Sequence, residues 1–230
     1  MANKKFIMVL DTETANGYLI NGKLDLSDSL VYDIGFTVID KKGNVYCQRS
    51  LAIGDILCGE PELMKTAYYA EKIPQYWKDI KSGKRELVSF LHARNIVKTT
   101  MEEYNITTIS AHNARFDVNA LNTTIRYLTK SKIRYFFPFK TEIWDTMKGA
   151  QNTIAKQKGY IFFCQKNGYL TRHKKPRVRV TAEILYKYIS GDHDFIEKHE
   201  GLDDTIIEAK ILVQILRQHS KKEYLILYPA

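Results

Sequence analysis

Three β-rich apolar runs open the chain before any helical pattern begins, and this order is the feature that most constrains the fold. The runs span Lys5–Leu10, Leu30–Asp40 and Val45–Ile53, and the turn sequence Lys41–Asn44 joins the last two. A short turn between two strands gives antiparallel pairing, so we expect a meander at the start of a sheet. The first run is expected to stop at Asp11, where the apolar residues end.

Helical and β-rich patterns alternate after Pro61, where a first helix is expected to start. The chain has no internal repeat and no low-complexity linker, so the alternation predicts a single α/β domain, residues 1–230, around a mixed sheet. Further helices are expected at 85–103, 113–129, 145–157, 181–190 and 203–219, strands at 106–111 and 133–139, and an exposed basic loop at 166–180.

Composition excludes several classes of protein. With 44% hydrophobic residues, 27% charged residues, 12 Gly and 5 Pro in 230 residues, the chain is neither collagen-like nor wholly disordered. Cys47, Cys58 and Cys164 lie far apart without a Cys-x-x-Cys pair, so we expect reduced thiols and neither a zinc knuckle nor a disulfide framework. Reduced thiols are typical of a cytoplasmic protein, which we expect here, and no apolar run is long enough to span a bilayer. We expect no binding to a membrane surface either, because Arg172–Arg179 shows no amphipathic helical pattern.

Positive charge is concentrated in one part of the chain. The formal net charge is +9, but residues 126–179 alone hold 14 Lys or Arg and two acids, a net +12, which leaves −3 for the rest. The same stretch is rich in aromatic residues, most of which we expect in the core, and Tyr169, next to the basic loop, is the one candidate for base stacking. An anionic partner such as nucleic acid is indicated, although a merely solvated loop is an equal interpretation for Arg172, Lys174, Lys175, Arg177 and Arg179.

Two carboxylates stand at the end of the first apolar run, in Asp11-Thr-Glu-Thr14. Residues i and i+2 of a strand point to the same side, so Asp11 and Glu13 are expected side by side. Adjacent carboxylates repel each other, and hard oxygen ligands suit Mg²⁺ or Mn²⁺. About 0.7 Asp-x-Glu pairs are expected by chance in a chain of this composition, so a solvated strand end is the alternative.

A second group, His112-Asn-Ala-Arg-Phe-Asp117, follows the run 106–111 and opens the next helical pattern. The His-Asn-x-x-x-Asp spacing is expected only about 0.02 times by chance. The alternatives are local: Asn113 as an N-cap, and Asp117 as a carboxylate favoured by the helix dipole. Phe116 falls on the apolar stripe of the helix, so core packing is its alternative.

A third group, His199-Glu-Gly-Leu-Asp-Asp204, runs into the last amphipathic helix. A His five residues before an Asp has a chance expectation of about 0.3, and the alternative is a loop histidine beside a capped helix. We assign the capping role to Asp203 and leave Asp204 for chemistry. The order of the three groups along the chain raises the significance of each.

Taken together, these groups resemble the motifs of the DnaQ-like or DEDDh 3′→5′ exonucleases of the ribonuclease H-like superfamily. The resemblance spans residues 11 to 204, almost the whole chain, and Trp144-Asp145-Thr146 matches a common polar step more weakly, with Asp145 not expected to bind metal. It implies an α/β ribonuclease H-like fold, a mixed five-stranded sheet flanked by helices. The chain departs from the polymerase-proofreading members at Leu57–Lys84 and in the basic loop.

The resemblance also implies roles for individual residues. Asp11 would bridge two Mg²⁺ or Mn²⁺ ions, Glu13 and Asp204 would complete the nucleophile-side site, and Asp117 would help to hold the second ion. His199 would be the general base. Residues expected to line the pocket or contact substrate are Thr12, Thr14, Ala15, His112, Asn113, Phe116, Arg172, Lys174, Lys175 and Arg177.

The sequence thus predicts a 3′→5′ exonuclease that releases nucleoside monophosphates from the 3′ end of single-stranded DNA, with a DNA polymerase as a possible partner. One alternative is an RNA-trimming member of the same family, since nothing in the chain specifically reads a 2′-hydroxyl. The other is a polymerase-associated nucleic-acid-binding module without activity.

Overall fold

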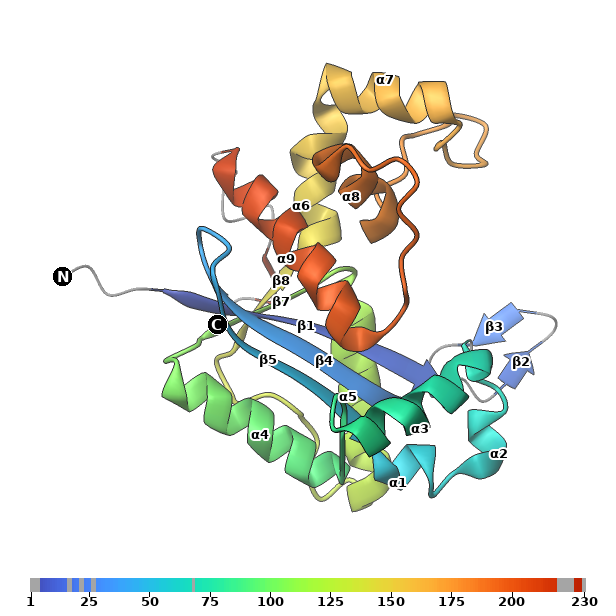
Figure 1. Ribbon diagram of the computed structural model, residues 1–230, viewed down its shortest axis with the longest axis vertical. Coiled ribbons are helices and arrows are strands. Elements are labelled where there is room, and N and C mark those ends of the chain that lie inside the picture. Colours follow the sequence, from blue (N-terminus) through green and yellow to red (C-terminus); the bar gives the residue numbers. More distant parts are fainter. Residues whose placement is uncertain are drawn as a thin grey trace.

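The computed structural model describes residues 5–15, 18–20, 23–25, 28–67, 69–218 and 226–228, and a mixed sheet forms its centre (Figure 1). The strand order is β6-β5-β4-β1-β7-β8-β9, and a separate hairpin joins β2 to β3. Pairing is antiparallel for β1/β4, β4/β5 and β8/β9, and parallel for β5/β6, β1/β7 and β7/β8. The strands are β1 (Phe6–Ala15), β2 (Tyr18–Ile20), β3 (Lys23–Asp25), β4 (Leu30–Asp40), β5 (Val45–Ile53), β6 (Glu86–Val88), β7 (Thr108–Ala111), β8 (Glu142–Asp145) and β9 (Ile226–Tyr228).

Helices cover both faces of this sheet (Figure 1). One apolar core lies between the sheet and α1 to α5, and a second lies between the sheet and α6 to α9. In β1 the side chains alternate between them: Met8 and Leu10 join the first core, whereas Ile7 and Val9 join the second. The helices are α1 (Gly54–Leu57), α2 (Pro61–Met64), α3 (Ile73–Ser82), α4 (Phe90–Glu103), α5 (Ala114–Thr129), α6 (Thr146–Asn152), α7 (Lys158–Asn167), α8 (Ala182–Ser190) and α9 (Gly201–Arg217), with 3₁₀ turns η1 (Ala70–Lys72) and η2 (Ile154–Lys156).

The predicted meander of β1, β4 and β5 is confirmed, and β4 and β5 have the predicted bounds. In the turn between them, the Asp40 carboxylate accepts hydrogen bonds from the backbone N–H groups of Lys42 and Asn44, while Gly43 takes φ +90°. β1 does not stop at Asp11. It continues to Ala15 because β4 pairs with it as far as the Ala15–Leu30 position.

The predicted strand at 133–139 is wrong. No strand forms there, although Phe136 is fully buried. Its N–H donates to Asn122 Oδ1 at 2.8 Å, and its carbonyl accepts from Arg94 Nε at 2.8 Å. Side chains therefore satisfy the backbone groups that a strand would have paired, and the sheet resumes only at β8.

Helix boundaries also differ from the sequence prediction. Ser89 caps α4, accepting from His92 N at 3.2 Å, so the helix expected from residue 85 begins at Phe90 and the residues before it form β6. The helix expected at 145–157 divides into α6 and η2, and α7 was not anticipated, so the exposed loop begins only after Asn167. The sheet has seven strands where five were predicted: β6, β8 and β9 were not anticipated, and the strand expected at 133–139 does not form.

The helices of the described residues include none with the length and apolar character needed to cross a lipid bilayer.

Candidate active site

The site forms where β1 separates from β7. The two strands pair only at Met8–Ile109 and Val9–Ser110, whereas β1 stays paired with β4 for its whole length. Asp11 and Glu13 continue the stripe of Ile7 and Val9 on the face covered by α9. The apolar stripe thus becomes acidic where the first turn of α9 lies against it.

The N-terminus of α9 lies in direct contact with β4. A Cβ atom on Gly35 would lie 2.0 Å from the carbonyl carbon of Gly201, so only glycine permits this approach. The close approach brings Asp204, in the first turn of α9, to the acidic end of β1. Asp204 is buried, and its Oδ1 atom has no hydrogen-bond partner among the described residues.

Asp117 reaches the same place from α5. β7 ends at Ala111, Asn113 takes a left-handed conformation with φ +65°, and α5 starts at the next residue. Asp117 Oδ1 then accepts hydrogen bonds from Thr12 N at 3.2 Å and Thr12 Oγ1 at 2.8 Å. Asn113 occupies the N-cap position, as the alternative interpretation had it, but its side chain accepts no capping hydrogen bond in the described structure.

Three of the predicted metal ligands meet in one cluster. Carboxylate oxygens of Asp11, Glu13 and Asp204 lie within 4.8 Å of one another. Hard oxygen donors of this kind, one of them buried and unpartnered, fit a divalent cation such as Mg²⁺ or Mn²⁺.

The electrostatics of the cluster agree with its geometry. Burial raises the pKa of Glu13 to about 9, with Asp33 and Asp204 adding repulsion. Burial also raises the pKa of Asp204 to about 8 and that of Asp117 to about 7, although the hydrogen bonds from Thr12 lower the latter. The pKa of Asp11 is raised well above its usual value by burial and by the surrounding carboxylates. A bound cation would offset this repulsion and favour the ionised forms.

A further buried carboxylate, Glu208, was not predicted from the sequence. It lies one helical turn after Asp204 on the inward face of α9, and its Oε2 atom accepts from His112 N at 3.2 Å. Burial and then the charge of Asp117 raise its pKa. The available signal was the i, i+4 spacing from Asp204 within an otherwise apolar helix face.

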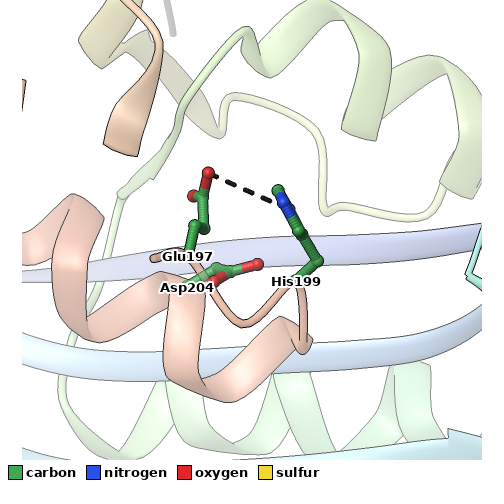
Figure 2. Close-up of side chains that lie close together, drawn as sticks. All are labelled: Glu197, His199 and Asp204. Carbon is green, nitrogen blue, oxygen red and sulfur yellow. Dashed lines mark ion pairs between the residues drawn. The ribbon is translucent and has the colours of Figure 1, made fainter. Parts of the chain in front are cut away.

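His199 stands at the mouth of the site. Its Nδ1 atom lies 3.9 Å from Glu197 Oε2, and Glu197, His199 and Asp204 form a second group of potential ligands within 4.8 Å (Figure 2). Burial, followed by the positive charge of Lys72, lowers the pKa of His199. The imidazole is therefore neutral at neutral pH, while burial raises the pKa of Glu197 to about 7.

Residues Leu57–Lys84, which depart from the resembled family, contact the His199 segment. The ring of Tyr69 stacks on the imidazole of His199 with centroids 4.5 Å apart and an interplanar angle of 13°. Lys72 Nζ donates to the carbonyl oxygen of Lys198 and to that of His199 at 3.3 Å. This segment therefore holds both the ring and the backbone of His199, which has φ +51°.

Asp33 is a second buried acid that the sequence did not reveal. It lies directly opposite Glu13 in the β1/β4 register, and a buried ion pair with Arg85 compensates its charge. Its Oδ2 atom also accepts from Tyr76 Oη at 3.0 Å and from Gly201 N at 3.2 Å. Asp33 thus ties the N-terminus of α9 to the sheet.

The basic loop is anchored next to the second predicted motif. His112 Nε2 contacts the carbonyl of Val180 at 2.8 Å, and its Nδ1 contacts Thr146 Oγ1 at 2.9 Å. Both ring nitrogens therefore contact protein atoms, and a substrate contact by His112 stays a prediction. Arg172, Lys174, Lys175 and Arg177 are exposed and form no ion pair with other residues that the structure describes.

The other predicted pocket residues belong to the two elements that carry the acids Asp11, Glu13 and Asp117. Thr12, Thr14 and Ala15 are buried in β1, and Phe116 is half-buried in the first turn of α5. Asp145, the polar residue of the weaker matching step, accepts hydrogen bonds from Met147 N and Lys148 N as the N-cap of α6.

Neither a family model nor a curated protein sequence matches this chain. Solved structures do resemble it. Cell-death related nuclease 4 has a TM-score of 0.50 at 12% identity over 94% of this chain and 64% of its own. E. coli Exonuclease I in complex with an oligonucleotide has a TM-score of 0.51 at 13% identity over 94% of this chain. A zinc-bound form of the E. coli Exonuclease I–ssDNA complex has a TM-score of 0.51 at 14% identity over 96% of this chain.

The chain spans only 41% and 42% of the two Exonuclease I chains. What these proteins share with it is the fold. The predicted fold class is therefore confirmed: an α/β fold with a mixed sheet between helices, close to the ribonuclease H-like architecture.

Proposed function

We propose that this protein is a divalent-metal-dependent 3′→5′ exonuclease of the DEDDh type that hydrolyses phosphodiester bonds of single-stranded DNA. The observation that carries the proposal is the convergence of Asp11, Glu13 and Asp204, with Asp117 and Glu208 buried beside them, on this fold. Five buried acids that repel one another near the end of β1 destabilise the fold, so their presence favours a function that requires a bound cation.

Asp11, Glu13 and Asp204 would hold the ions, with Asp117 completing the set. Two Mg²⁺ or Mn²⁺ ions, when bound, stabilise negative charge on the attacking and leaving oxygens of a phosphodiester. Thr12 keeps Asp117 in place through its two hydrogen bonds. The close packing of Gly201 on Gly35 holds the first turn of α9, and with it Asp204, against the sheet.

His199 is suited to accept the proton of the attacking water. Its Nδ1 faces Glu197, which leaves Nε2 for the proton transfer. The lowered pKa of His199 keeps this nitrogen unprotonated at neutral pH, the form that a base requires. Stacking on Tyr69 restricts the ring to one plane, so the base is positioned before substrate arrives.

The exposed cations of the basic loop favour a polyanionic substrate. The His112 ring contacts the carbonyl of Val180 at the end of this loop, which places the loop beside the second motif. The loop residues that would contact phosphates there are Arg172, Lys174, Lys175 and Arg177. The solved complexes of E. coli Exonuclease I contain DNA oligonucleotides, which supports DNA as the first substrate to test. RNA is the second candidate, and a polymerase partner remains a prediction.

The deciding experiment uses a 5′-labelled single-stranded oligonucleotide with Mg²⁺. We expect a descending ladder of products, and a 3′-label released as mononucleotide, because attack begins at the 3′ end. Asp204→Asn should abolish the ladder. Matched DNA and RNA strands in parallel separate the two substrate classes.

A neighbouring acid provides the matched control. Asp203 lies in the same helical turn, but its side chain is 36% exposed and pairs with Lys198 at 3.3 Å. Asp203→Asn should retain most activity. Absence of product from the wild-type protein with DNA and RNA, or equal activity in the two variants, would contradict the proposed function.

A further inference from the structure

A groove of about 1070 Å³ lies along α5, and none of the carboxylates described above lines it. One wall is the outer side of α5, from Val118 to Arg126. The opposite wall is the segment 132–141, which lacks regular structure and leads into β8. No part of the proposed chemistry uses this groove.

The irregular wall is held in a defined position. Its central residue, Phe136, packs against Phe90 of α4 with ring centroids 5.3 Å apart. Its backbone is bonded to Asn122 and Arg94, as described above. Thr141 closes a turn by donating from Oγ1 to the Pro138 carbonyl at 2.8 Å. The groove is therefore preformed and does not need a partner to assemble it.

The charge of the groove has a single sign. No acidic residue lines it, and none of its cations forms an ion pair with another residue in the described ranges. The nearby Glu142 is buried in β8 beneath it. The lining cations are Arg94, Arg126, Lys132, Arg134 and Lys140.

Two aromatic rings of the groove are unusually exposed. The side chain of Phe139 is 93% exposed and that of Tyr135 is 68% exposed. This corrects the expectation that Tyr169 would be the exposed aromatic: Tyr169 is half-buried against Phe163, and Lys187 lies over its ring. Exposed rings flanked by cations, here Arg134 before Tyr135 and Lys140 after Phe139, are the combination that binds bases and phosphates together.

We propose that this groove is an accessory binding site for single-stranded nucleic acid, with bases stacking on Tyr135 and Phe139 and phosphates contacting Arg126, Arg134 and Lys140. A duplex would present its phosphates but not the faces of its bases, so it would not use the rings. An acidic peptide would use the cations alone. The choice of nucleic acid as the bound strand rests on the proposed function, whereas the groove, its rings and its cations are independent of it.

The groove and the carboxylate site lie on the same helix, so a strand bound in the groove would be near the carboxylates. α5 carries both sites: Asp117 faces inward at its first turn, and Asn119, Asn122 and Arg126 face the groove. At 1.5 Å per residue, Asp117 and Arg126 are about 14 Å apart along the helix axis. A strand held in the groove would raise the local concentration of its own end at the carboxylate site.

The test measures oligonucleotide binding in EDTA, where no cleavage occurs, by fluorescence anisotropy of a labelled single-stranded 20-mer. Replacing both exposed rings, Tyr135→Ala with Phe139→Ala, should raise Kd about tenfold or more. Arg134→Ala with Lys140→Ala should lower the slope of log Kd against log salt by about 1.4, roughly 0.7 for each cation. Phe162→Ala is the matched control, because Phe162 is 67% exposed on α7 and does not line the groove.

The outcomes separate the groove from the catalytic site. Altered binding with a native melting temperature supports the groove even if no variant, nor the wild type, cleaves DNA. Unchanged Kd and salt slope in both double variants would overturn it, even if the wild type is an active exonuclease. An equal loss of affinity for blunt duplex, or competition by poly-glutamate as effective as by the oligonucleotide, would also overturn it.

Discussion

Replacing Glu13 with glutamine should stabilise the metal-free protein while removing its response to Mg²⁺. Burial and the neighbouring Asp33 and Asp204 raise the pKa of Glu13 to about 9, against an ordinary value of 4.5. Between these two values the folded state holds a proton that the unfolded state releases. The stability of the metal-free protein therefore falls as pH rises through this window.

The size of the effect follows from the pKa. At pH 7 the unfolded state has released the proton of Glu13, whose ordinary pKa of 4.5 lies 2.5 units lower, whereas the folded state retains it. At 1.36 kcal/mol per unit, this proton costs the folded state about 3 kcal/mol of stability relative to acidic pH. Glutamine carries no charge to neutralise, so E13Q should unfold about 6–12 °C higher than the wild type in EDTA at pH 7. At pH 5 the difference should shrink to less than about 1 kcal/mol.

Thermal unfolding in EDTA and in Mg²⁺, followed at pH 5, 7 and 8, measures both effects. Mg²⁺ should stabilise the wild type increasingly as pH rises, because binding requires ionised carboxylates, and should do little for E13Q. Glu62→Gln is the control: its side chain is 83% exposed and pairs, among the residues that the structure describes, with Lys65 alone, so the stability of this variant should differ from wild type by less than about 0.5 kcal/mol. The reasoning fails if E13Q is no more stable than the wild type at pH 7, or if its advantage is the same at pH 5.

Three further predictions follow from the contacts around the site. Tyr69→Ala should lower kcat about 10- to 100-fold with little change in KM, whereas Tyr69→Phe, which keeps the ring stacked on His199, should stay near wild type; equal rates would contradict the positioning role. Gly35→Ala should destabilise the fold by about 1–3 kcal/mol or more and weaken Mg²⁺ binding, because its Cβ atom would clash with the backbone of α9. Gly54→Ala is the control, since its Cβ atom would lie 3.5 Å from its nearest neighbour, and it should change neither the free energy of unfolding nor the Mg²⁺ titration. Lys72→Gln should move the acidic limb of the pH–rate profile to higher pH, because the charge of Lys72 lowers the pKa of His199. An unmoved limb would contradict the role of His199 as the base.

Several features could be predicted because they depend on short stretches of chain. The turn at Lys41–Asn44 and its flanking strands follow from alternating apolar residues and turn chemistry, and they have the predicted bounds. The spacing in Asp11-Thr-Glu13 places two acids on one strand face whatever the remainder of the chain does. The basic loop was recognisable as exposed from its composition, although α7 shortens it.

Other features depend on contacts between distant segments. The run 133–139 has the composition of a strand, but Asn122 and Arg94 bond its backbone instead. The buried role of Asp33 depends on Arg85, which lies 52 residues later in the chain and pairs with it. Tyr69 and Lys72 belong to no motif, yet they hold His199, more than 120 residues away.

The sequence alone determined the α/β class, the concentration of positive charge and the identity of the acids at the end of β1, because each depends on local periodicity or composition. The resemblance placed Asp204 beside those acids, but only the tertiary structure decided that Glu208 joins them, that the segment Leu57–Lys84 holds His199, and that exposed rings and cations share one groove along α5. The physical reason is that burial and electrostatic repulsion act between side chains that are adjacent in space, and the packing of α9 on β4 through Gly35 and Gly201 sets that proximity.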